Sequence, residues 1–308
     1  GGAALREEQH RVFLERGADR VNPFMIPHTI VNTPAALVAA EFGLRGPNFS
    51  TTTACAAGAD AIGVAAATLR RGEADVMVAG GSDALVTPLF VAGFDAMRVL
   101  SRSNDEPEKA ARPFDRDRDG FLIGEGGAAL VLETAEGAEK RGARVLCEIA
   151  GYGASADAYH TTDPDPTGGA QGRAITACLA DAGLAPEEIG YINTHGGGSQ
   201  PGDPAEISAI AGALGAQVAA GIPVSATKSM HGHCMGGTGA LEACLTALAL
   251  HEGVLPPTIN LENPAEGCDA VTHIAGTARR EQVDAALSTS FGLGGQNTVL
   301  CLRRGAEE

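Results

Sequence analysis

Strand-like apolar runs alternate along this chain with helices made largely of alanine and glycine, and this alternation restricts the possible folds more than any other feature. The predicted strands are residues 48–53, 74–79, 127–132, 145–151, 189–193 and 223–227, and the predicted helices are residues 6–16, 34–42, 56–71, 169–182, 203–214 and 237–251. Two further runs, 286–290 and 298–303, predict an antiparallel pair joined by the glycine loop 292–295. Strands that alternate with helices indicate a layered α/β fold.

Composition and charge exclude several classes of protein. With 308 residues, 44% of them hydrophobic, the chain can bury a sizeable core. A formal net charge of −16, with no basic run, argues against nonspecific nucleic-acid binding. The apolar stretches are too short or too interrupted by glycine for a membrane span, and we expect no signal peptide. Seven irregularly spaced cysteines are typical of reduced thiols, so we expect a cytoplasmic protein.

A weak internal repetition suggests two related halves. Cys55 precedes a helix of small residues that ends at Gly72, and His233 precedes a similar helix that ends at Gly253. Sequence identity between the two segments is slight, so the repetition is only suggestive. We divide the chain into residues 1–142, which carry Cys55, and residues 143–308, which carry His233.

Cys55 lies where a strand-like run gives way to a helix, unlike the other cysteines of the chain. Unpaired backbone N–H groups at a helix start stabilise a thiolate and lower its pKa, and they can form half of an oxyanion hole. Most free cysteines are small buried apolar residues, and that interpretation suits those within apolar runs: Cys147, Cys178, Cys244 and Cys301.

Imidazoles follow two other predicted strands. His195 lies in a glycine-rich turn, a position typical of functional residues in α/β proteins. Lys228, His231 and His233 form a second cluster beside Cys234. Closely spaced histidines beside a cysteine leave a metal site open as an alternative, although no second ligand pair with zinc-type spacing accompanies them. The glycine run at 292–295 lacks the Lys-Ser/Thr ending of a phosphate-binding loop.

A series of short motifs runs in order along the whole chain. They are Gly43–Pro47, Thr53–Cys55, Ala79–Gly81, Arg112–Asp115, Asp119–Phe121, Lys228–Met230, Gly232–His233, Pro256–Asn260 and Ser290–Gly292. Together they resemble the β-ketoacyl-acyl carrier protein synthases, most closely the type II elongating enzymes of bacterial fatty acid synthesis. The resemblance extends from Gly1 to about Arg304.

The resemblance implies a thiolase-like α/β fold and an expected assembly. Two pseudo-symmetric βαβαβαββ halves would pack into a five-layer αβαβα sandwich, and two copies would form a homodimer. The family has on the order of a hundred further residues before Gly1. We therefore expect an N-terminally truncated chain with an incomplete first half, in which Gly1 and Gly2 match a glycine turn after the second strand. The activity of such a chain alone is uncertain.

The resemblance also implies roles for four reactive residues. Cys55 matches the nucleophile that takes the acyl chain from acyl carrier protein as a thioester. His195 and His233 match the pair that binds the malonyl thioester carbonyl and promotes its decarboxylation in a Claisen condensation. Lys228 matches the active-site lysine of the family. Two imidazole N–H donors aimed at the enolate oxygen would stabilise its charge.

Further positions match supporting residues of the family. The backbone N–H groups of Cys55 and Leu293 would form the oxyanion hole, and Phe291 and Leu293 lie at the acyl gate. Glu242 matches the buried carboxylate that pairs with Lys228, which is expected because an unpaired buried ammonium is costly. Asp203 and Glu206 match acidic residues behind His195.

The chain departs from the family pattern at several positions near this site. Leu293 replaces a phenylalanine that gates the acyl pocket, and Gln296 stands where threonine is common. Of two hydroxyls that hold the phosphopantetheine arm, one place is Gly197 and only Ser199 remains. His231 stands where the family has a small or polar residue.

The resemblance implies no tightly bound cofactor and no metal; the phosphopantetheine arm of acyl carrier protein would bring the substrates. A non-catalytic partner similar to a chain-length factor is the alternative function, which Cys55 with both histidines argues against. Thiolases use a second cysteine near the C-terminal loop, and residues 290–297 have none. Initiating synthases use asparagine where this chain has His233. The sequence does not separate fatty acid from polyketide synthesis.

Overall fold

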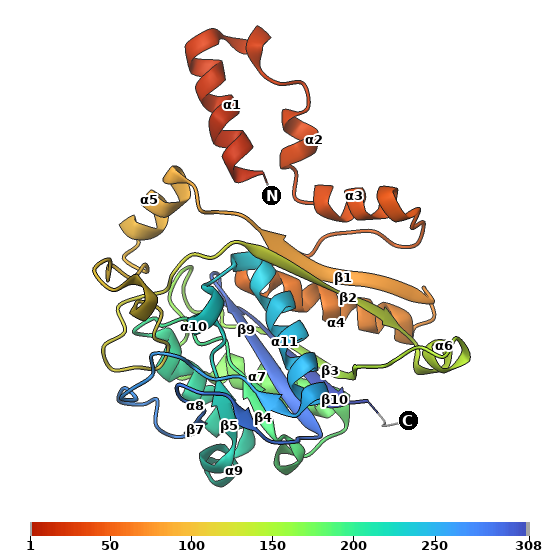
Figure 1. The fold of residues 1–308 in the computed structure, drawn as a ribbon, viewed down its shortest axis with the longest axis vertical. Helices are drawn as coiled ribbons and strands as arrows, with labels where there is room; N and C mark the ends of the chain where they lie inside the picture. Colours follow the sequence, from red (N-terminus) through yellow and green to blue (C-terminus); the bar gives the residue numbers. More distant parts are fainter. Residues whose placement is uncertain (1, 306–308) are drawn as a thin grey trace.

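Two larger β-sheets form the body of the protein in the computed structural model, which describes residues 2–305 (Figure 1). The first sheet pairs β1 (Val76–Asp83) with β2 (Gly126–Glu133) in antiparallel register. The second has six strands in the order β3–β10–β9–β4–β5–β7. These strands are β3 (Cys147–Ala156), β4 (Tyr191–Asn193), β5 (Pro223–Ser225), β7 (Thr272–His273), β9 (Ala285–Gly292) and β10 (Gln296–Arg304). A small antiparallel pair, β6 (Val254–Leu255) and β8 (Arg279–Arg280), lies apart from both.

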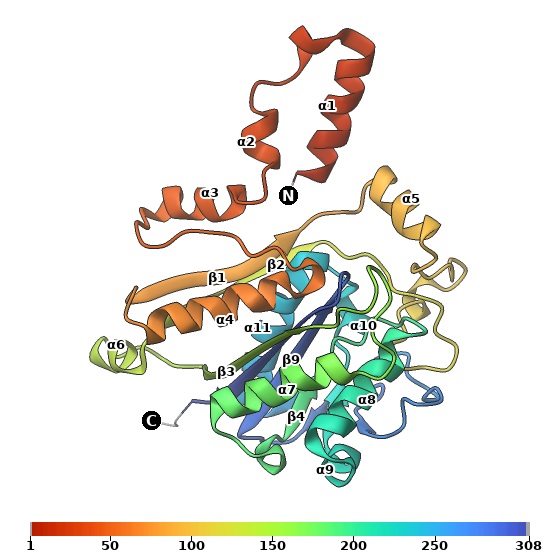
Figure 2. The same cartoon turned by 180° about the vertical axis from the view of Figure 1, so that it is seen from behind.

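Helices lie between the two sheets and outside them (Figures 1 and 2). The helices α4 (Ala57–Arg70) and α11 (Thr238–Glu252) fill the space between the sheets. The outer face of the six-stranded sheet is covered by α7 (Gly169–Ala182) and α8 (Gly202–Leu214), while α3 (Thr33–Phe42) lies beyond the two-stranded sheet. The order α–β–α–β–α confirms the predicted five-layer, thiolase-like α/β fold.

The remaining helices lie at the edges of the body. Helices α1 (Ala3–Arg16) and α2 (Met25–Thr29) precede α3 in the chain. They project away from the body, on the side of the two-stranded sheet (Figure 2). The others at the edges are α5 (Pro88–Ala96), α6 (Ala135–Lys140) and α9 (Ala216–Gly221). The exception is the short α10 (Lys228–His231), which lies within the body and whose Lys228 and Ser229 are buried (Figure 1). No helix within residues 2–305 is both long enough and apolar enough to span a bilayer.

Each face of the six-stranded sheet carries its own hydrophobic core. Ile175 of α7 and Ile210 of α8 pack with Ile192 of β4 in the outer core. In the inner core, Ile62 of α4 and Leu250 of α11 pack with strands of both sheets. All five side chains are fully buried, and burying each large aliphatic side chain contributes roughly 1.5–3 kcal/mol. The two cores therefore fix α4 and α11 against the sheet that carries the histidines.

Small residues let α4 and α11 approach very closely where both helices begin. A Cβ atom on Gly58 would lie 2.7 Å from the Ala240 nitrogen, and one on Gly239 would lie 2.8 Å from the Ala59 nitrogen. Larger residues at either position would push the helices apart. This contact brings the segment before α4 close to the segment before α11.

Arg70, at the end of α4, ties the first part of the chain to the second. Its guanidinium donates to the carbonyls of Ile149 and Ala150 on β3 at 2.9 and 2.8 Å and forms an ion pair with Asp181 of α7 at 2.7 Å. A planar guanidinium can bind several acceptors at once, so one side chain links α4, β3 and α7.

Two expectations from the sequence were wrong. Residues 48–53 form no strand, because no strand lies beside them within the described chain. The strand predicted over residues 74–79 instead covers Val76–Asp83, since the ladder to β2 continues through Gly80 and Gly81 to Asp83. The expectation for Gly1 lies outside the described residues.

Candidate active site

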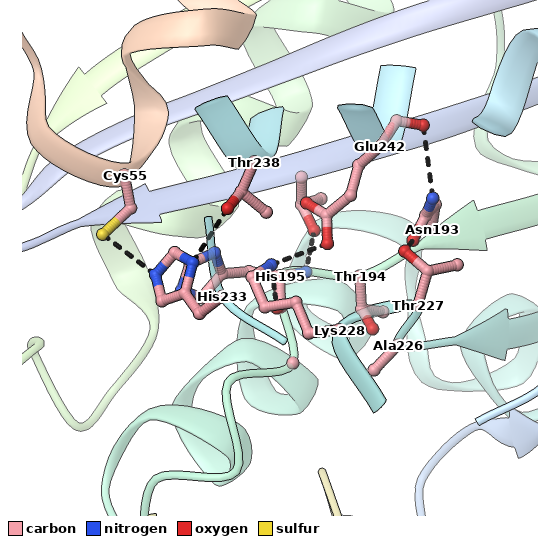
Figure 3. Close-up of polar contacts among 12 residues, drawn as sticks. Cys55, Asn193, Thr194, His195, Ala226, Thr227, Lys228, His233, Thr238 and Glu242 are labelled. Carbon is pink, nitrogen blue, oxygen red and sulfur yellow. Dashed lines mark hydrogen bonds and ion pairs between the residues drawn. The ribbon is translucent and has the colours of Figure 1, made fainter. Parts of the chain in front are cut away.

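Cys55 lies in the 3₁₀ turn Ala54–Ala56 that leads into α4, where the sequence predicted it. The Ala56 N–H donates to the Thr53 carbonyl at 3.0 Å, and Ala54 adopts a positive φ of 50°. A positive φ is strained for alanine, and such strain collects at functional sites. The turn presents the Cys55 thiol, 7% exposed, toward the second half of the chain (Figure 3).

His233 reaches the thiol from the loop between α10 and α11. Its Nε2 lies 3.1 Å from the Cys55 Sγ, and its Nδ1 lies 2.9 Å from the Thr238 hydroxyl (Figure 3). The Phe121 ring packs edge-on against the imidazole with ring centres 5.4 Å apart. The contacts with Thr238 and Phe121 therefore hold the His233 ring so that its Nε2 faces the thiol.

His195 follows β4 and completes a cluster of three reactive side chains. Its ring centre lies 5.5 Å from that of His233, with the two planes nearly perpendicular, and 5.9 Å from that of Phe291. The His195 Nδ1 is buried without a hydrogen-bond partner within the described chain. Cys55, His195 and His233 thus meet from three separate segments.

Buried carboxylates hold the turn that carries His195. Glu206 of α8 accepts the N–H groups of His195 and Gly196 at 2.7 and 2.8 Å, and it also accepts the Thr289 hydroxyl at 2.7 Å. Burial raises the pKa of Glu206 to about 7, with these hydrogen bonds opposing the rise. The carboxylate binds the backbone of the turn, so it fixes where the imidazole stands.

Asp203, one turn earlier on α8, binds the other end of the same turn. It accepts the Gly198 N–H at 3.0 Å and the Phe114 N–H at 2.7 Å, and its carboxylate lies 3.4 Å from the Arg118 guanidinium. Burial raises the pKa of Asp203 to about 6. Asp203 therefore joins the His195 turn to the loop around Phe114.

Lys228 forms the predicted pair with Glu242. Its ammonium donates to Glu242 Oε1 at 2.7 Å, and it also donates to the His195 carbonyl (Figure 3). Both side chains are almost completely buried. Burial raises the pKa of Glu242 to about 7, and the neighbouring ammonium opposes that rise. The lysine acts on His195 through its backbone, behind the imidazole.

Both imidazoles are neutral at physiological pH. Burial lowers the pKa of His195 and of His233 well below the ordinary value, and the Lys228 charge lowers both further. A neutral imidazole keeps one N–H donor and one acceptor nitrogen. When the Thr238 hydroxyl donates to Nδ1 of His233, Nε2 carries the proton and faces the site.

The thiol does not have the lowered pKa expected from its helix-start position. Burial is the largest influence and raises the pKa of Cys55. Hydrogen bonds from the Leu293 and Cys55 backbone N–H groups and the Lys228 charge act in the opposite direction but are smaller. Desolvation outweighs the helix N-terminus because the thiol is enclosed rather than exposed to water.

The loop between β9 and β10 lies against the thiol. The Leu293 backbone N–H favours the ionised form of the Cys55 thiol and so opposes the rise in its pKa, while Leu293 is 36% exposed and Phe291 is buried. Two backbone N–H groups from separate segments, those of Cys55 and Leu293, therefore converge at the nucleophile. This is the arrangement that an oxyanion hole requires.

Ser199 lies at the start of α8, at the edge of this cluster. Its hydroxyl accepts the Gly202 N–H at 3.0 Å and can still donate to another group. No group of three or more His, Cys, Asp or Glu side chains within residues 2–305 is arranged to hold a metal ion. His231 instead places its Nε2 3.2 Å from the Thr227 hydroxyl.

Reasoning from the sequence missed two residues that contact the site directly. Thr238 bonds His233, and Thr289 accepts the His195 N–H at 2.9 Å. Thr238 lies in a run of glycines and Thr289 stands between two serines, and neither setting singles out the residue as a partner of a histidine. Phe121 belongs to a motif noted above, but its contact with His233 follows only from the fold.

Comparison with known families and proteins agrees with this geometry. Residues 1–138 match the N-terminal domain of beta-ketoacyl synthase, and residues 146–262 match the C-terminal domain. The 3-oxoacyl-[acyl-carrier-protein] synthase 2 of Synechocystis sp. is 48% identical over 304 residues, which cover 99% of this chain and 73% of that protein. The protein of the same name from Vibrio cholerae is 46% identical, with the same coverage.

Solved structures show the same likeness. One is a type II polyketide synthase acyl-carrier protein in complex with its ketosynthase, with a TM-score of 0.95, 34% identity, and coverage of 99% of this chain and 76% of that chain. Another is a beta-ketoacyl synthase from Burkholderia phymatum, with a TM-score of 0.91, 36% identity, and coverage of 97% and 72%. With family matches over both halves and these relatives, the chain belongs to the β-ketoacyl synthase family of condensing enzymes.

Proposed function

We propose that this protein elongates acyl chains as a 3-oxoacyl-acyl carrier protein synthase, with Cys55 as the nucleophile. The observation that carries the proposal is the enclosed cluster in which the Cys55 thiol lies 3.1 Å from the His233 imidazole, beside His195. The name shared by the relatives with 48% and 46% identity supports fatty acid synthesis as the pathway.

In the first half-reaction, the Cys55 sulfur attacks the carbonyl of an acyl thioester. The carbonyl oxygen becomes an oxyanion within reach of the Cys55 and Leu293 N–H groups. As the tetrahedral intermediate collapses, the new C–S bond to Cys55 remains and the old C–S bond breaks. The carrier leaves as a thiol with the proton that Cys55 gave up. Preorganised donors are effective here because the site is enclosed.

In the second half-reaction, a malonyl thioester occupies the space beside both histidines. Its carboxylate leaves as CO₂, and the electron pair of the broken C–C bond forms an enolate. N–H donors of the neutral His195 and His233 imidazoles stabilise the enolate oxygen. The enolate carbon then attacks the acyl-Cys55 carbonyl, the C–S bond breaks, and the Cys55 sulfur takes up a proton.

Both substrates would arrive on the phosphopantetheine arm of acyl carrier protein, without a tightly bound cofactor. A surface cavity of about 340 Å³ is lined by Arg98, Leu100, Arg102 and Asp119. Leu100 forms a β-bridge to Phe121, whose ring touches His233. In a chain with a net charge of −16, the arginines of this cavity favour the phosphate of the arm. Arg102 is also paired with Asp95 at 2.9 Å, so we expect Arg98 to be the main phosphate ligand.

The proposal also covers how the chain divides into two halves and how two copies of the protein assemble. The halves 1–142 and 143–308 are supported by the family matches, which end at residue 138 and resume at residue 146. A homodimer is supported by exposed apolar side chains in the first fifty residues, among them Phe13, Phe24, Leu37, Phe42 and Phe49. The alternative of a non-catalytic chain-length-factor-like partner is not favoured, since Cys55 and both imidazoles are present.

Incubation of the full-length protein with acyl carrier protein loaded with an acyl group tests the nucleophile. Intact mass should rise by one acyl group, and peptide mapping should place it on Cys55. Cys55→Ala should gain no mass, whereas Cys268→Ala, which removes a buried thiol outside the cluster, should be acylated like the wild type. Label on Cys234 or Cys268 instead would overturn the assignment.

The paired histidines make a separate prediction. His195→Ala and His233→Ala should each lower CO₂ release from malonyl carrier protein by about a hundredfold or more, the usual cost of losing a main electrostatic donor. Acyl transfer to Cys55 should persist in part. His231→Ala is the matched control and should release CO₂ normally. Normal CO₂ release from either of the first two variants would refute the paired role.

A further inference from the structure

Asp60 is a buried carboxylate that the proposed mechanism does not use. It lies on α4, five residues after Cys55, and is only 5% exposed. Its partners within residues 2–305 are three hydroxyls, and no ion pair is formed with a lysine or arginine there. A buried carboxylate without a cationic partner is costly, so its retention calls for a physical reason.

The three hydroxyls come from three separate segments. Thr53, two residues before Cys55, donates to Asp60 Oδ2. Thr298 of β10 donates to Oδ1 at 2.6 Å, and Tyr152 of β3 donates to the same oxygen at 2.8 Å. Hydrogen bonds to an ionised acceptor are about twice as strong as those between neutral groups. Asp60 therefore links α4 to β3, to β10 and to the residue that precedes the Cys55 turn.

Thr53 and Thr298 belong to the two segments that supply N–H groups to the thiol. The Thr53 carbonyl closes the turn that carries Cys55, next to the strained Ala54. Thr298 lies near the start of β10, after the loop that carries Leu293, and it pairs with Ser290 before that loop. The Asp60 carboxylate thus accepts a hydrogen bond from each of the two segments that supply an N–H donor.

The two segments also touch each other. A Cβ atom on Gly292 would lie 2.7 Å from the Thr53 carbonyl oxygen, so the loop passes directly over the Cys55 turn. At such a close approach, a small shift of either segment changes the separation of the Cys55 and Leu293 N–H groups. An oxyanion hole loses much of its effect when its donors move from the position of the oxyanion.

We propose that Asp60 is a positioning residue for the oxyanion hole: through Thr53 and Thr298 it sets the spacing of the two backbone donors. The inference rests on the proposed function, in which those donors hold the oxyanion of both half-reactions. Asp60 touches neither substrate nor thiol. Its effect is confined to steps that form a tetrahedral oxyanion.

Two reactions of the same thiol separate this role from a general structural one. Alkylation by iodoacetamide displaces iodide at an sp³ carbon and forms no oxyanion, whereas acyl transfer from an acyl thioester does. In full-length Asp60→Asn, acyl transfer should fall by about tenfold to a hundredfold, less than the loss of a whole donor. Alkylation of Cys55 should stay within about twofold of the wild type.

Two further variants complete the test. Thr298→Val removes only the hydroxyl on the side of the loop, and it should also slow acyl transfer while leaving alkylation unchanged. This variant keeps the proposal testable when Asp60→Asn does not fold. Asp181→Asn, a carboxylate that accepts the Tyr152 N–H outside this network, should leave both rates unchanged. Equal losses in alkylation and acyl transfer, or no loss in either, would overturn the inference. Failure of the wild type to be acylated would instead refute the proposed function.

Discussion

At the scale of single residues, Leu293 is the position where this chain differs most from its family in the site. Its backbone N–H favours the ionised form of the Cys55 thiol, and its side chain is partly exposed. Leucine is smaller than phenylalanine and lacks a flat ring, and glycines on either side let the loop move. We therefore expect a looser acyl gate, so that the full-length protein accepts long or branched acyl groups more readily than Leu293→Phe.

Acyl-transfer rates for short and long chains in the two proteins measure this effect. The ratio of long-chain to short-chain rate should fall in Leu293→Phe. Gln296→Thr restores the other departure in the loop and serves as a control that leaves Leu293 in place. Unchanged relative rates in Leu293→Phe would mean that another residue closes the pocket.

The neutral histidines predict how stability depends on pH. Their folded pKa values lie well below the ordinary value, so unfolded histidines bind protons at a higher pH than folded ones. The stability that each contributes is complete above about pH 6.5 and is lost as pH falls, by at most about 1.4 kcal/mol per pH unit. The wild type should therefore lose more stability than His233→Gln between pH 7.5 and pH 5.5.

Urea unfolding of both proteins at the two pH values gives the comparison. The difference between their slopes isolates His233, because Glu206 and the other carboxylates titrate in both proteins. His251→Gln, which changes a histidine outside the cluster, provides a control with the wild-type slope. Parallel loss of stability in wild type and His233→Gln would show that the buried imidazole takes up a proton in the folded state.

The sequence predicted the reactive residues better than their partners. Cys55 and His195 follow strand-like runs, and all three reactive residues stand beside small residues, so local pattern and motif identify them. The partners act across long separations in the chain: Thr289 lies 94 residues from His195, and Thr298 lies 238 residues from Asp60. Tertiary hydrogen bonds of this kind leave no periodic signal in a single sequence.

At the scale of elements, the contact between α4 and α11 sets the separation of nucleophile and imidazole. Gly58→Ala places a methyl group 2.7 Å from the Ala240 nitrogen and 2.9 Å from the Gly236 oxygen, where only a shift of one helix makes room. We expect a loss of about 1–3 kcal/mol in the free energy of unfolding. We also expect slower acylation of Cys55, because Cys55 and His233 precede these two helices.

Gly212→Ala is the matched control, since no atom lies within 4 Å of its added methyl group on α8. It should be neutral or gain up to about 1 kcal/mol, because alanine favours helix over glycine. Chemical denaturation and acylation rates of both variants provide the measurement. If Gly58→Ala is as stable as Gly212→Ala and is acylated at the same rate, α4 and α11 can move apart without loss of stability or activity.

Elements were predicted well where local signals and tertiary packing agreed. Residues 169–182 form α7 with the predicted bounds, because Gly168 and Gly183 at its ends adopt the left-handed conformation that stops a helix. Residues 48–53 have strand-like composition, but within residues 2–305 no strand lies beside them to accept their hydrogen bonds. A strand is stable only with a partner, which composition cannot supply.

At the scale of the whole molecule, the exposed apolar side chains of α3 and the segment after it predict an interface between two copies. Phe42 is 71% exposed and Phe49 is 50% exposed. Light scattering after size exclusion should give the mass of a dimer for the full-length protein, and Phe42→Asp with Phe49→Asp should shift it toward monomer. Val145→Asp, at an exposed position in the second half, should remain dimeric. A wild type that is monomeric at every concentration would contradict the homodimer.

The Arg70 link between α4 and β3 limits how genes of this family can be recombined. A crossover near residue 142 inherits Arg70 from one parent and the strand that carries Ile149 and Ala150 from the other. The carbonyls are backbone atoms and survive any exchange, but Asp181 is a side chain that the second parent must also provide. Whether a chimera made at this boundary is stable should therefore depend on whether both parents encode the arginine and the aspartate, whatever the overall sequence identity of the parents.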